Sequence, residues 1–253
     1  MKFSANLGFL WNDRSLPDAI RAAKAAGFDA VECHWPYDYP TQAVKAALDE
    51  TKLVMLGLNT ARGNVGIGEF GLCALPNRVD DARCSIDQAI RYARAIRSPN
   101  IHVMAGNATG ADAHQTFIEN LKYACAQAAP FQLTVLIEPM NTFDVPNYFL
   151  TTTSQAIAAI NTVNASNLKL MFDCYHVKLI GDDVMQRLTD LLPHIGHIQI
   201  ASVPDRGTPD HGDVDYTQIF KYITALEFNT PLGAEYRPVG DTDASLGWLR
   251  RAQ

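Results

Sequence analysis

The fold of this chain is constrained most by a regular alternation between short apolar runs and segments with helical periodicity. Eight apolar runs are typical of buried strands: 2–7, 30–34, 53–59, 101–106, 133–138, 168–173, 197–201 and 232–236. Between them, apolar residues recur at helical spacing over 15–27, 41–50, 79–96, 114–129, 154–163, 183–192 and 216–226. Alternating strands and helices predict an α/β fold of parallel strands joined by crossover helices.

The number of units indicates a closed barrel. Eight strand–helix units in a chain of 253 residues match the size of a (β/α)8 TIM barrel. A doubly wound open sheet is the alternative, and a glycine-rich turn after the first strand would favour it. That strand instead runs into NLGFLWND, which is not a GxGxxG turn. No linker, repeat or low-complexity tract divides the chain, so we expect one barrel domain over residues 1–253.

Composition and charge argue against several classes of function. Hydrophobic residues make up 47% and charged residues 19% of the chain, as in a globular protein with a sizeable core. A net charge of −6 argues against nucleic acid as the main partner, because phosphate binding needs a basic surface. We find no secretory signal and no apolar run of about 18 residues to span a membrane. Five scattered cysteines without a CxxC pair predict free thiols in the reducing cytoplasm.

Polar side chains stand at the C-terminal ends of all eight predicted strands, where barrel enzymes place their chemistry. They are Asn6, Glu32 with His34, Asn59, His102, Glu138, Asp173, Gln199 and Glu235. For Asn6 and Asn59, capping a helix or satisfying loop backbone is an equally good explanation. The last four carry more weight, because three acids on one rim need a counterion.

Those last four residues form a candidate divalent-metal site. Three carboxylates and an amide oxygen suit Mg²⁺ or Mn²⁺, whereas zinc more usually recruits His or Cys. A metal held by Glu138, Asp173, Gln199 and Glu235 can bind two adjacent substrate oxygens and acidify the neighbouring C–H bond. Glu138 and Glu235 end strands five and eight, and they are the candidate general acid–base pair.

Further polar residues near this rim are candidates for substrate binding. His176 follows Asp173 by three residues, in a segment that we place in the loop above strand six, and we expect it to donate to a substrate oxygen. Arg206, just after strand seven, could bind a substrate carboxylate or hydroxyl, with a solvated surface arginine as the alternative. Glu69 lies on a glycine-rich loop of the kind that closes over substrates, and His102 ends strand four.

Three other residues are interpreted as structural. His194 and His197 flank the start of strand seven, and we expect them at the opposite, stability face of the barrel. Cys174 stands beside the candidate site, but a small buried residue is a simpler interpretation than a nucleophile.

These residues belong to a series of motifs. In chain order the motifs are FSANL, FDAVE, PYDYP, LNTARGNVGIGEFGLCALPNR, AIRYARA, HVMAG, LIEPMN, FDCYH, GHIQIA, PDRGTPDHGDVDY, GAEYRP and LGW. With them the chain resembles the sugar isomerases and epimerases that have a xylose-isomerase-like barrel. Within that family it is similar to the hydroxypyruvate isomerase group, which includes the 2-oxo-tetronate isomerases. The resemblance covers nearly the whole chain.

The resemblance implies a metal-dependent isomerase that moves a carbonyl between adjacent carbons through an enediol. It implies acid–base roles for Glu138 and Glu235, and metal ligation by these two with Asp173 and Gln199. The positions of His176 and Arg206 match residues that contact substrate in the related ketose epimerases. Those epimerases often carry His where this chain has Gln199.

The expected substrate is a small hydroxy-oxo acid: hydroxypyruvate, converted to tartronate semialdehyde, or a four-carbon 2-oxo acid. Its carboxylate would explain Arg206 at the rim, and Arg62 in the TARGN segment is a further candidate for that contact. Three alternatives remain: a ketose 3-epimerase, a metal-dependent nuclease, and a sugar-acid binding protein without catalysis. The acidic balance disfavours the nuclease, and the presence of both glutamates disfavours the binding protein. A homo-oligomer is compatible with the sequence.

Overall fold

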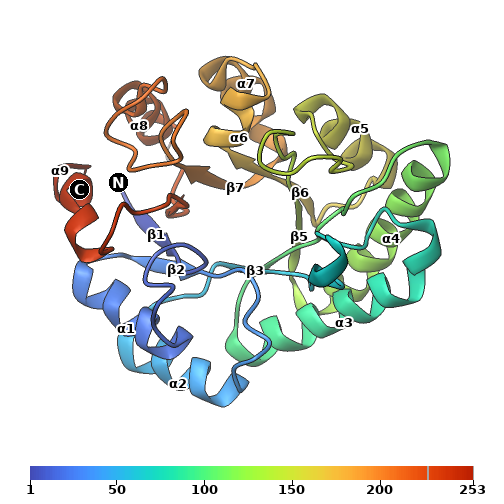
Figure 1. Cartoon of the computed structure of the whole chain (residues 1–253), viewed down its shortest axis with the longest axis horizontal. Coiled ribbons are helices and arrows are strands. Elements are labelled where there is room, and N and C mark those ends of the chain that lie inside the picture. The colour runs from blue at the N-terminus through green and yellow to red at the C-terminus, as the bar shows by residue number, and fades with distance from the viewer. Residues whose placement is uncertain (227, 253) are drawn as a thin grey trace.

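Parallel strands form the centre of the computed structural model, which describes residues 1–226 and 228–252 (Figure 1). They are β1 (Phe3–Asn6), β2 (Ala30–Glu32), β3 (Gly57–Asn59), β4 (Asn100–His102), β5 (Thr134–Ile137), β6 (Leu168–Asp173), β7 (Ile195–Ile200) and β8 (Leu232–Ala234). Their order is β2-β1-β8-β7-β6-β5-β4-β3. The ring closes between β2 and β3, where the N–H of Val31 donates to Val54 and that of Cys33 to Gly57, at 3.0 and 3.1 Å. The predicted (β/α)8 barrel is therefore confirmed.

Helices surround the strands in Figure 1. They are α1 (Leu16–Ala26), α2 (Thr41–Thr51), α3 (Val79–Ile96), α4 (Ala111–Ala128), α5 (Thr153–Val163), α6 (Cys174–Leu179), α7 (Val184–Leu191), α8 (Tyr216–Ala225) and α9 (Gly247–Ala252). All seven predicted helical segments are present. Two short helices, α6 and α9, were not predicted, because six residues are too few to establish a helical period. The prediction that His176 lies in a loop is thus wrong, since it belongs to α6.

The ends of α1 form as the sequence predicts. The Ser15 hydroxyl accepts a hydrogen bond from the N–H of Asp18, and Pro17 occupies the first turn, where its missing N–H costs nothing. Gly27 ends the helix with φ 96°, a left-handed conformation that other residues adopt only at a cost.

The strand predicted over 101–106 ends four residues early, at His102. Residues 103–106 leave the sheet after β4, because their carbonyls pair with the loop that follows β3. The N–H of Cys73 donates to Met104 at 3.2 Å, and that of Ala74 donates to Ala105 at 2.7 Å. These two hydrogen bonds hold the glycine-rich loop against the top of the barrel.

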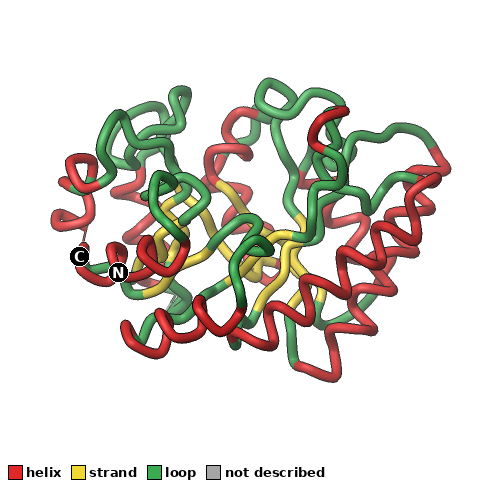
Figure 2. Tube along the Cα trace, turned by 60° about the horizontal axis from the view of Figure 1, so that its bottom comes forward, coloured by secondary structure: helices red, strands yellow, loops and turns green. Residues whose placement is uncertain are grey.

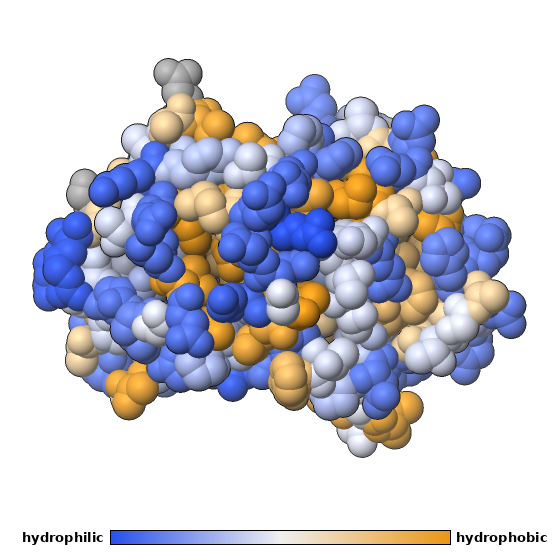
Figure 3. All heavy atoms as spheres, turned by 90° about the horizontal axis from the view of Figure 1, so that it is seen from above, coloured by the Kyte–Doolittle hydropathy of each residue, from blue (hydrophilic) through white to orange (hydrophobic). Residues whose placement is uncertain are grey.

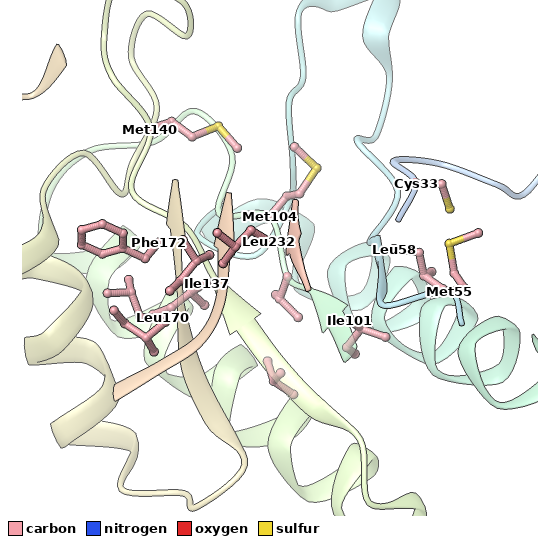
Figure 4. Close-up of a cluster of buried hydrophobic side chains, with 14 of the residues drawn as sticks. Cys33, Met55, Leu58, Ile101, Met104, Ile137, Met140, Leu170, Phe172 and Leu232 are labelled. Carbon is pink, nitrogen blue, oxygen red and sulfur yellow. The ribbon is translucent and has the colours of Figure 1, made fainter. Parts of the chain in front are cut away.

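Residues along the strands alternate between the barrel interior and the surrounding helices. In β7, Ile198 and Ile200 belong to the hydrophobic core, whereas His197 and Gln199 line a central cavity. The core side includes Ile101, Ile137, Leu170, Phe172 and Leu232, which Figure 4 shows among the clustered side chains. The placement of His197 at the stability face is therefore wrong, because its side chain lies in the barrel interior.

The chain termini meet on one side of the barrel (Figure 1). Trp248 of α9 packs edge-on against Phe3 of β1, with ring centroids 5.1 Å apart, so the C-terminal LGW motif contributes to the core. Polar and apolar residues are mixed over the face in Figure 3. None of the described helices has the length and apolar character needed to cross a bilayer.

Candidate active site

A cavity of about 480 Å³ is lined by residues at the C-terminal ends of the strands. Loops gather at this end of the barrel (Figure 2). Of the predicted site residues, those in the cavity wall are Glu138, Gln199, Glu235, His176, Arg206 and His102. Asp173 lies beside it with a fully buried side chain. Glu69 is not part of the wall, because its carboxylate pairs with Arg78 and accepts from the N–H of Asn64 at 2.6 Å.

Strand register places the candidate metal ligands side by side. Asp173 of β6 pairs with Gln199 of β7, and Gln199 in turn pairs with Gly233 of β8, two residues before Glu235. Glu138 directly follows β5. Within the described part of the chain, one oxygen of Glu138 and the amide oxygen of Gln199 are buried without a hydrogen-bond partner. Buried polar atoms rarely stay unpartnered, so these two oxygens are candidate metal ligands.

The guanidinium of Arg206 lies between two of the acids. Its Nη2 is 2.6 Å from Glu235 Oε2 and 3.2 Å from Asp173 Oδ2. Glu235 Oε1 accepts further hydrogen bonds from Asn6 Nδ2 at 2.8 Å and from His34 Nε2 at 2.9 Å. Arg206 is only 6% exposed, which excludes the alternative of a solvated surface arginine.

The two glutamates have opposite electrostatic environments. Burial raises the pKa of Glu138 well above its usual range, and the nearby charges of Glu235 and Asp173 add to this. Burial has the same tendency at Glu235, but Arg206 and His34 outweigh it and hold its pKa well below the usual range. Burial also raises the pKa of Asp173 to about 7, against the attraction of Arg206. Burial therefore favours the protonated form of Glu138, whereas Arg206 and His34 favour the ionised form of Glu235.

The residues fit a divalent cation by charge and by donor chemistry. The buried carboxyl groups of Glu138, Asp173 and Glu235 face a single buried guanidinium, so even with Glu138 protonated the negative charges of Asp173 and Glu235 exceed the charge of the guanidinium by one. A divalent ion would balance them, and carboxylate and amide oxygens are the ligands that Mg²⁺ and Mn²⁺ prefer.

His176 also lies within reach of this cluster. One potential ligand atom from each of Glu138, Asp173 and His176 lies within 4.8 Å of the other two. However, His176 Nδ1 accepts a hydrogen bond from the backbone N–H of Asn141 at 3.0 Å. Burial lowers the pKa of His176 to about 3, so the ring is neutral and its single proton sits on Nε2. That nitrogen is a donor towards the cavity, which fits a substrate contact better than metal ligation.

Two further residues at the site were not given roles by the sequence. His34 and Asn6 hold the Glu235 carboxylate, as described above, and both line the cavity. They stood among the strand-end polar residues, but nothing in their local sequence indicates which side chain across the barrel they contact. Arg62 stacks over the Trp35 ring at 3.8 Å and is not part of the cavity wall.

Comparison with known proteins identifies the family. A family model described as a xylose isomerase-like TIM barrel matches residues 20–252. The chain belongs to this family. The membership expected from the motifs is therefore confirmed.

Two relatives that match nearly the whole chain are named as isomerases. The chain is 42% identical to a 2-oxo-tetronate isomerase from Cupriavidus necator, over 98% of this chain and 97% of the relative. It is 35% identical to the hydroxypyruvate isomerase of Escherichia coli, over 98% of both chains. The resemblance to the hydroxypyruvate isomerase group, including the 2-oxo-tetronate isomerases, is thus also confirmed.

Solved structures agree on the barrel. A Brucella melitensis protein, titled AP endonuclease of family 2, superimposes with a TM-score of 0.95 at 33% identity, covering 99% of this chain and 98% of that one. A D-allulose 3-epimerase from Methylomonas sp. superimposes with a TM-score of 0.81 at 17% identity, covering 100% and 97%. The second similarity shows the fold alone.

Replacing Asp173 with Asn should change how the stability of the metal-free protein depends on pH. The pKa of Asp173 is raised to about 7 in the folded state, from about 3.9 unfolded. Its contribution to stability is therefore full below about pH 4 and lost as the pH rises towards 7. One pKa unit is worth about 1.4 kcal/mol. Between about pH 5 and 7.5, the free energy of unfolding of the variant should therefore rise by up to about 3 kcal/mol relative to that of the wild type.

Denaturant unfolding in EDTA at both pH values measures this gain. Asn can still accept from the N–H of Tyr175 and begin α6, so the comparison changes the charge while keeping the cap. If the free energies of unfolding of variant and wild type differed by the same amount at both pH values, the raised pKa of Asp173 would be contradicted.

Proposed function

We propose that this protein is a divalent-metal-dependent isomerase of a small hydroxy-oxo acid, which moves a carbonyl between adjacent carbons through an enediol. Hydroxypyruvate and 2-oxo-tetronate are the proposed substrates, since the relatives carry these names. One observation carries the proposal: two buried glutamates reach the same cavity with oppositely shifted pKa values. Such a pair supplies an acid and a base at the same pH.

The proposed metal ligands are Glu138, Asp173, Gln199 and Glu235. A divalent ion in this position would bind two adjacent substrate oxygens and acidify the C–H bond beside the carbonyl. The remaining steps belong to the side chains of the protein.

Glu235 is ionised and takes the proton from the hydroxyl-bearing carbon. The electron pair of that C–H bond forms the double bond of an enediolate, whose oxygen accepts a hydrogen bond from His176 Nε2. Glu138 is protonated and gives its proton to the former carbonyl carbon. The hydroxyl proton moves to the neighbouring oxygen, which completes the exchange of carbonyl and hydroxyl. Proton exchange with water then resets the two carboxyl groups.

His102 supplies a second substrate contact. Burial lowers the pKa of His102 to about 3, so its ring is neutral. Its Nδ1 lies 3.2 Å from Asn59 Oδ1, which assigns the ring proton to that nitrogen. Nε2 is then a buried acceptor without a partner among the described residues. We infer that it accepts a hydrogen bond from a substrate hydroxyl.

Substrate charge points to a different arginine from the one that the sequence suggested. Arg206 is already paired with Asp173 and Glu235. Arg237 lines the mouth of the cavity, and no described carboxylate lies within ion-pair distance of its guanidinium. A substrate carboxylate would find in Arg237 a cation that the protein has not neutralised. We therefore assign recognition of the carboxylate to Arg237.

The charge of the cavity wall argues against a nuclease. Among the described residues of the wall, the carboxylates are Glu32, Glu138, Asp144 and Glu235, and the arginines are Arg206 and Arg237. A phosphodiester backbone would meet net repulsion in such a wall. A ketose 3-epimerase would use the same two glutamates, so products must separate that alternative.

A substrate panel with added Mg²⁺ or Mn²⁺ tests the proposed function. Hydroxypyruvate and 2-oxo-tetronate should be isomerised, and free ketoses should react much more slowly. In D₂O the product should carry deuterium on the carbon that receives the proton, because Glu138 exchanges with solvent. NMR follows both outcomes. Complete retention of substrate hydrogen would indicate hydride transfer and refute the enediol, and epimerised ketoses as the main products would favour the epimerase.

Replacing Glu138 with Gln should abolish turnover while the protein stays folded. The variant loses a proton donor that is typically worth about 10²–10⁴-fold in rate, and one proposed metal ligand with it. Steady-state rates and circular dichroism measure the two effects. Glu50→Gln is the control, because Glu50 pairs with Arg21 on the surface of the helical ring. Near-normal turnover in the Glu138 variant would remove this residue from the proposed pair.

Replacing Arg237 with Gln should raise the KM for the acid substrates and leave the KM for a slowly used neutral ketose unchanged. A charge-assisted hydrogen bond is worth about 1.5–3 kcal/mol, which corresponds to roughly 10–100-fold in KM. Arg62→Gln is the matched control, since Arg62 also lacks a described carboxylate partner but is not itself part of the cavity wall, although it stacks on the wall residue Trp35. A larger KM effect in the Arg62 variant would move the carboxylate contact to that residue.

A further inference from the structure

A second buried polar network lies inside the barrel beside the proposed metal ligands. Its centre is the carboxylate of Glu32, which is 4% exposed and projects from the end of β2. Glu32 Oε2 is 2.5 Å from His197 Nε2, and Glu32 Oε1 accepts from Gln199 Nε2 at 2.8 Å. Asn6 Nδ2 donates to the same Oε1 at 3.0 Å. One carboxylate thus joins β2 to β1 and β7.

The neighbouring strand leaves room for this carboxylate. A Cβ atom on Gly233 of β8 would lie 2.6 and 2.7 Å from the two oxygens of Glu32, and 2.8 Å from Gln199 Cγ. Any larger residue at this position would displace Glu32 or Gln199. The side chain of Glu32 therefore crosses the barrel interior above a strand that has no side chain there.

The contact with Glu32 decides which way the amide of Gln199 faces. Its nitrogen donates to Glu32, while its oxygen is buried and has no partner among the described residues. Because an amide has one donor end and one acceptor end, anchoring the nitrogen on Glu32 leaves the oxygen, at the other end of the amide, free to bind a metal ion. No other described hydrogen bond fixes this orientation.

The same carboxylate supports a second proposed ligand through Asn6. The N–H of Gly8 donates to Asn6 Oδ1 at 2.9 Å, so the amide nitrogen of Asn6 must face the acids. That nitrogen donates to both Glu32 and Glu235, at 3.0 and 2.8 Å. Glu32 is thereby connected to Gln199 directly and to Glu235 through one side chain.

We propose that Glu32 is a positioning residue for the divalent metal, which orients the amide oxygen of Gln199 towards the ion. The inference rests on the metal cage of the proposed function. Removing a residue that hydrogen-bonds to a metal ligand commonly changes metal affinity by about 10–100-fold.

Mn²⁺ binding without substrate tests this role, by electron paramagnetic resonance of the free ion. Glu32→Met keeps the length of the side chain but removes the acceptor, and it should weaken Mn²⁺ binding by about 10–100-fold. Glu32→Gln should bind Mn²⁺ within a few-fold of wild type. Its side-chain carbonyl can still accept from Gln199, and its amide N–H can donate to Nε2 of His197 when that ring carries its proton on Nδ1. Thermal unfolding of the metal-free variants separates lost affinity from lost stability.

A double-mutant cycle with Gln199→Glu separates positioning from a general effect on the fold. A carboxylate at position 199 presents an oxygen to the metal in either orientation, so it needs no orienting partner. The Glu32→Met change should therefore weaken Mn²⁺ binding in the wild-type background but not in the Gln199→Glu background, where it also removes the repulsion between two adjacent carboxylates. If Glu32→Met fails to fold, the paired apolar variant Glu32→Leu with His197→Phe replaces it in the cycle.

The outcomes distinguish the two proposals. Wild-type affinity in the Glu32→Met protein, or an equal loss of affinity in both backgrounds, would overturn the positioning role and leave the proposed function intact. Absence of Mn²⁺ binding by the wild-type protein would overturn the metal cage itself, and the positioning role with it.

Discussion

The site depends on one buried ion pair, between the guanidinium of Arg206 and the carboxylate of Glu235. A buried acid remains neutral unless a partner compensates the loss of water, and Arg206 supplies that compensation at 2.6 Å. Glu138 lines the same cavity, and one of its carboxyl oxygens is buried without a hydrogen-bond partner among the described residues. Burial favours the protonated form of this carboxyl group. The placement of a single cation therefore makes two chemically identical side chains different, which acid–base catalysis requires.

The sequence predicts the barrel and the main acids well because both follow from local patterns. Apolar runs that alternate with helical segments predict parallel strands, and parallel strands bring their C-terminal ends to one face. Asp173 and Gln199, at the ends of consecutive strands, had to be neighbours once the barrel closed, and the register pairs them directly. No knowledge of side-chain packing was needed for that inference.

The sequence does not predict which distant side chains meet inside the barrel. His197 contacts Glu32, 165 residues earlier, and His34 contacts Glu235, 201 residues later. These contacts depend on strand tilt and on how far each side chain projects across the interior, and neither is encoded in a local pattern. The placement of His197 at the stability face was wrong because β7 begins at Ile195, two residues before the predicted start, which puts His197 inside the strand.

The arginines illustrate how burial separates two functions that sequence assigns to one residue type. Position in the chain suggested Arg206 as the partner of a substrate carboxylate, but the surrounding acids have already neutralised it. Arg237, two residues after Glu235, is exposed at the cavity mouth, so its charge remains available to a ligand. In the proposed function, the inner arginine adjusts the pKa values of the catalytic acids, and the outer arginine recognises the charge of the substrate.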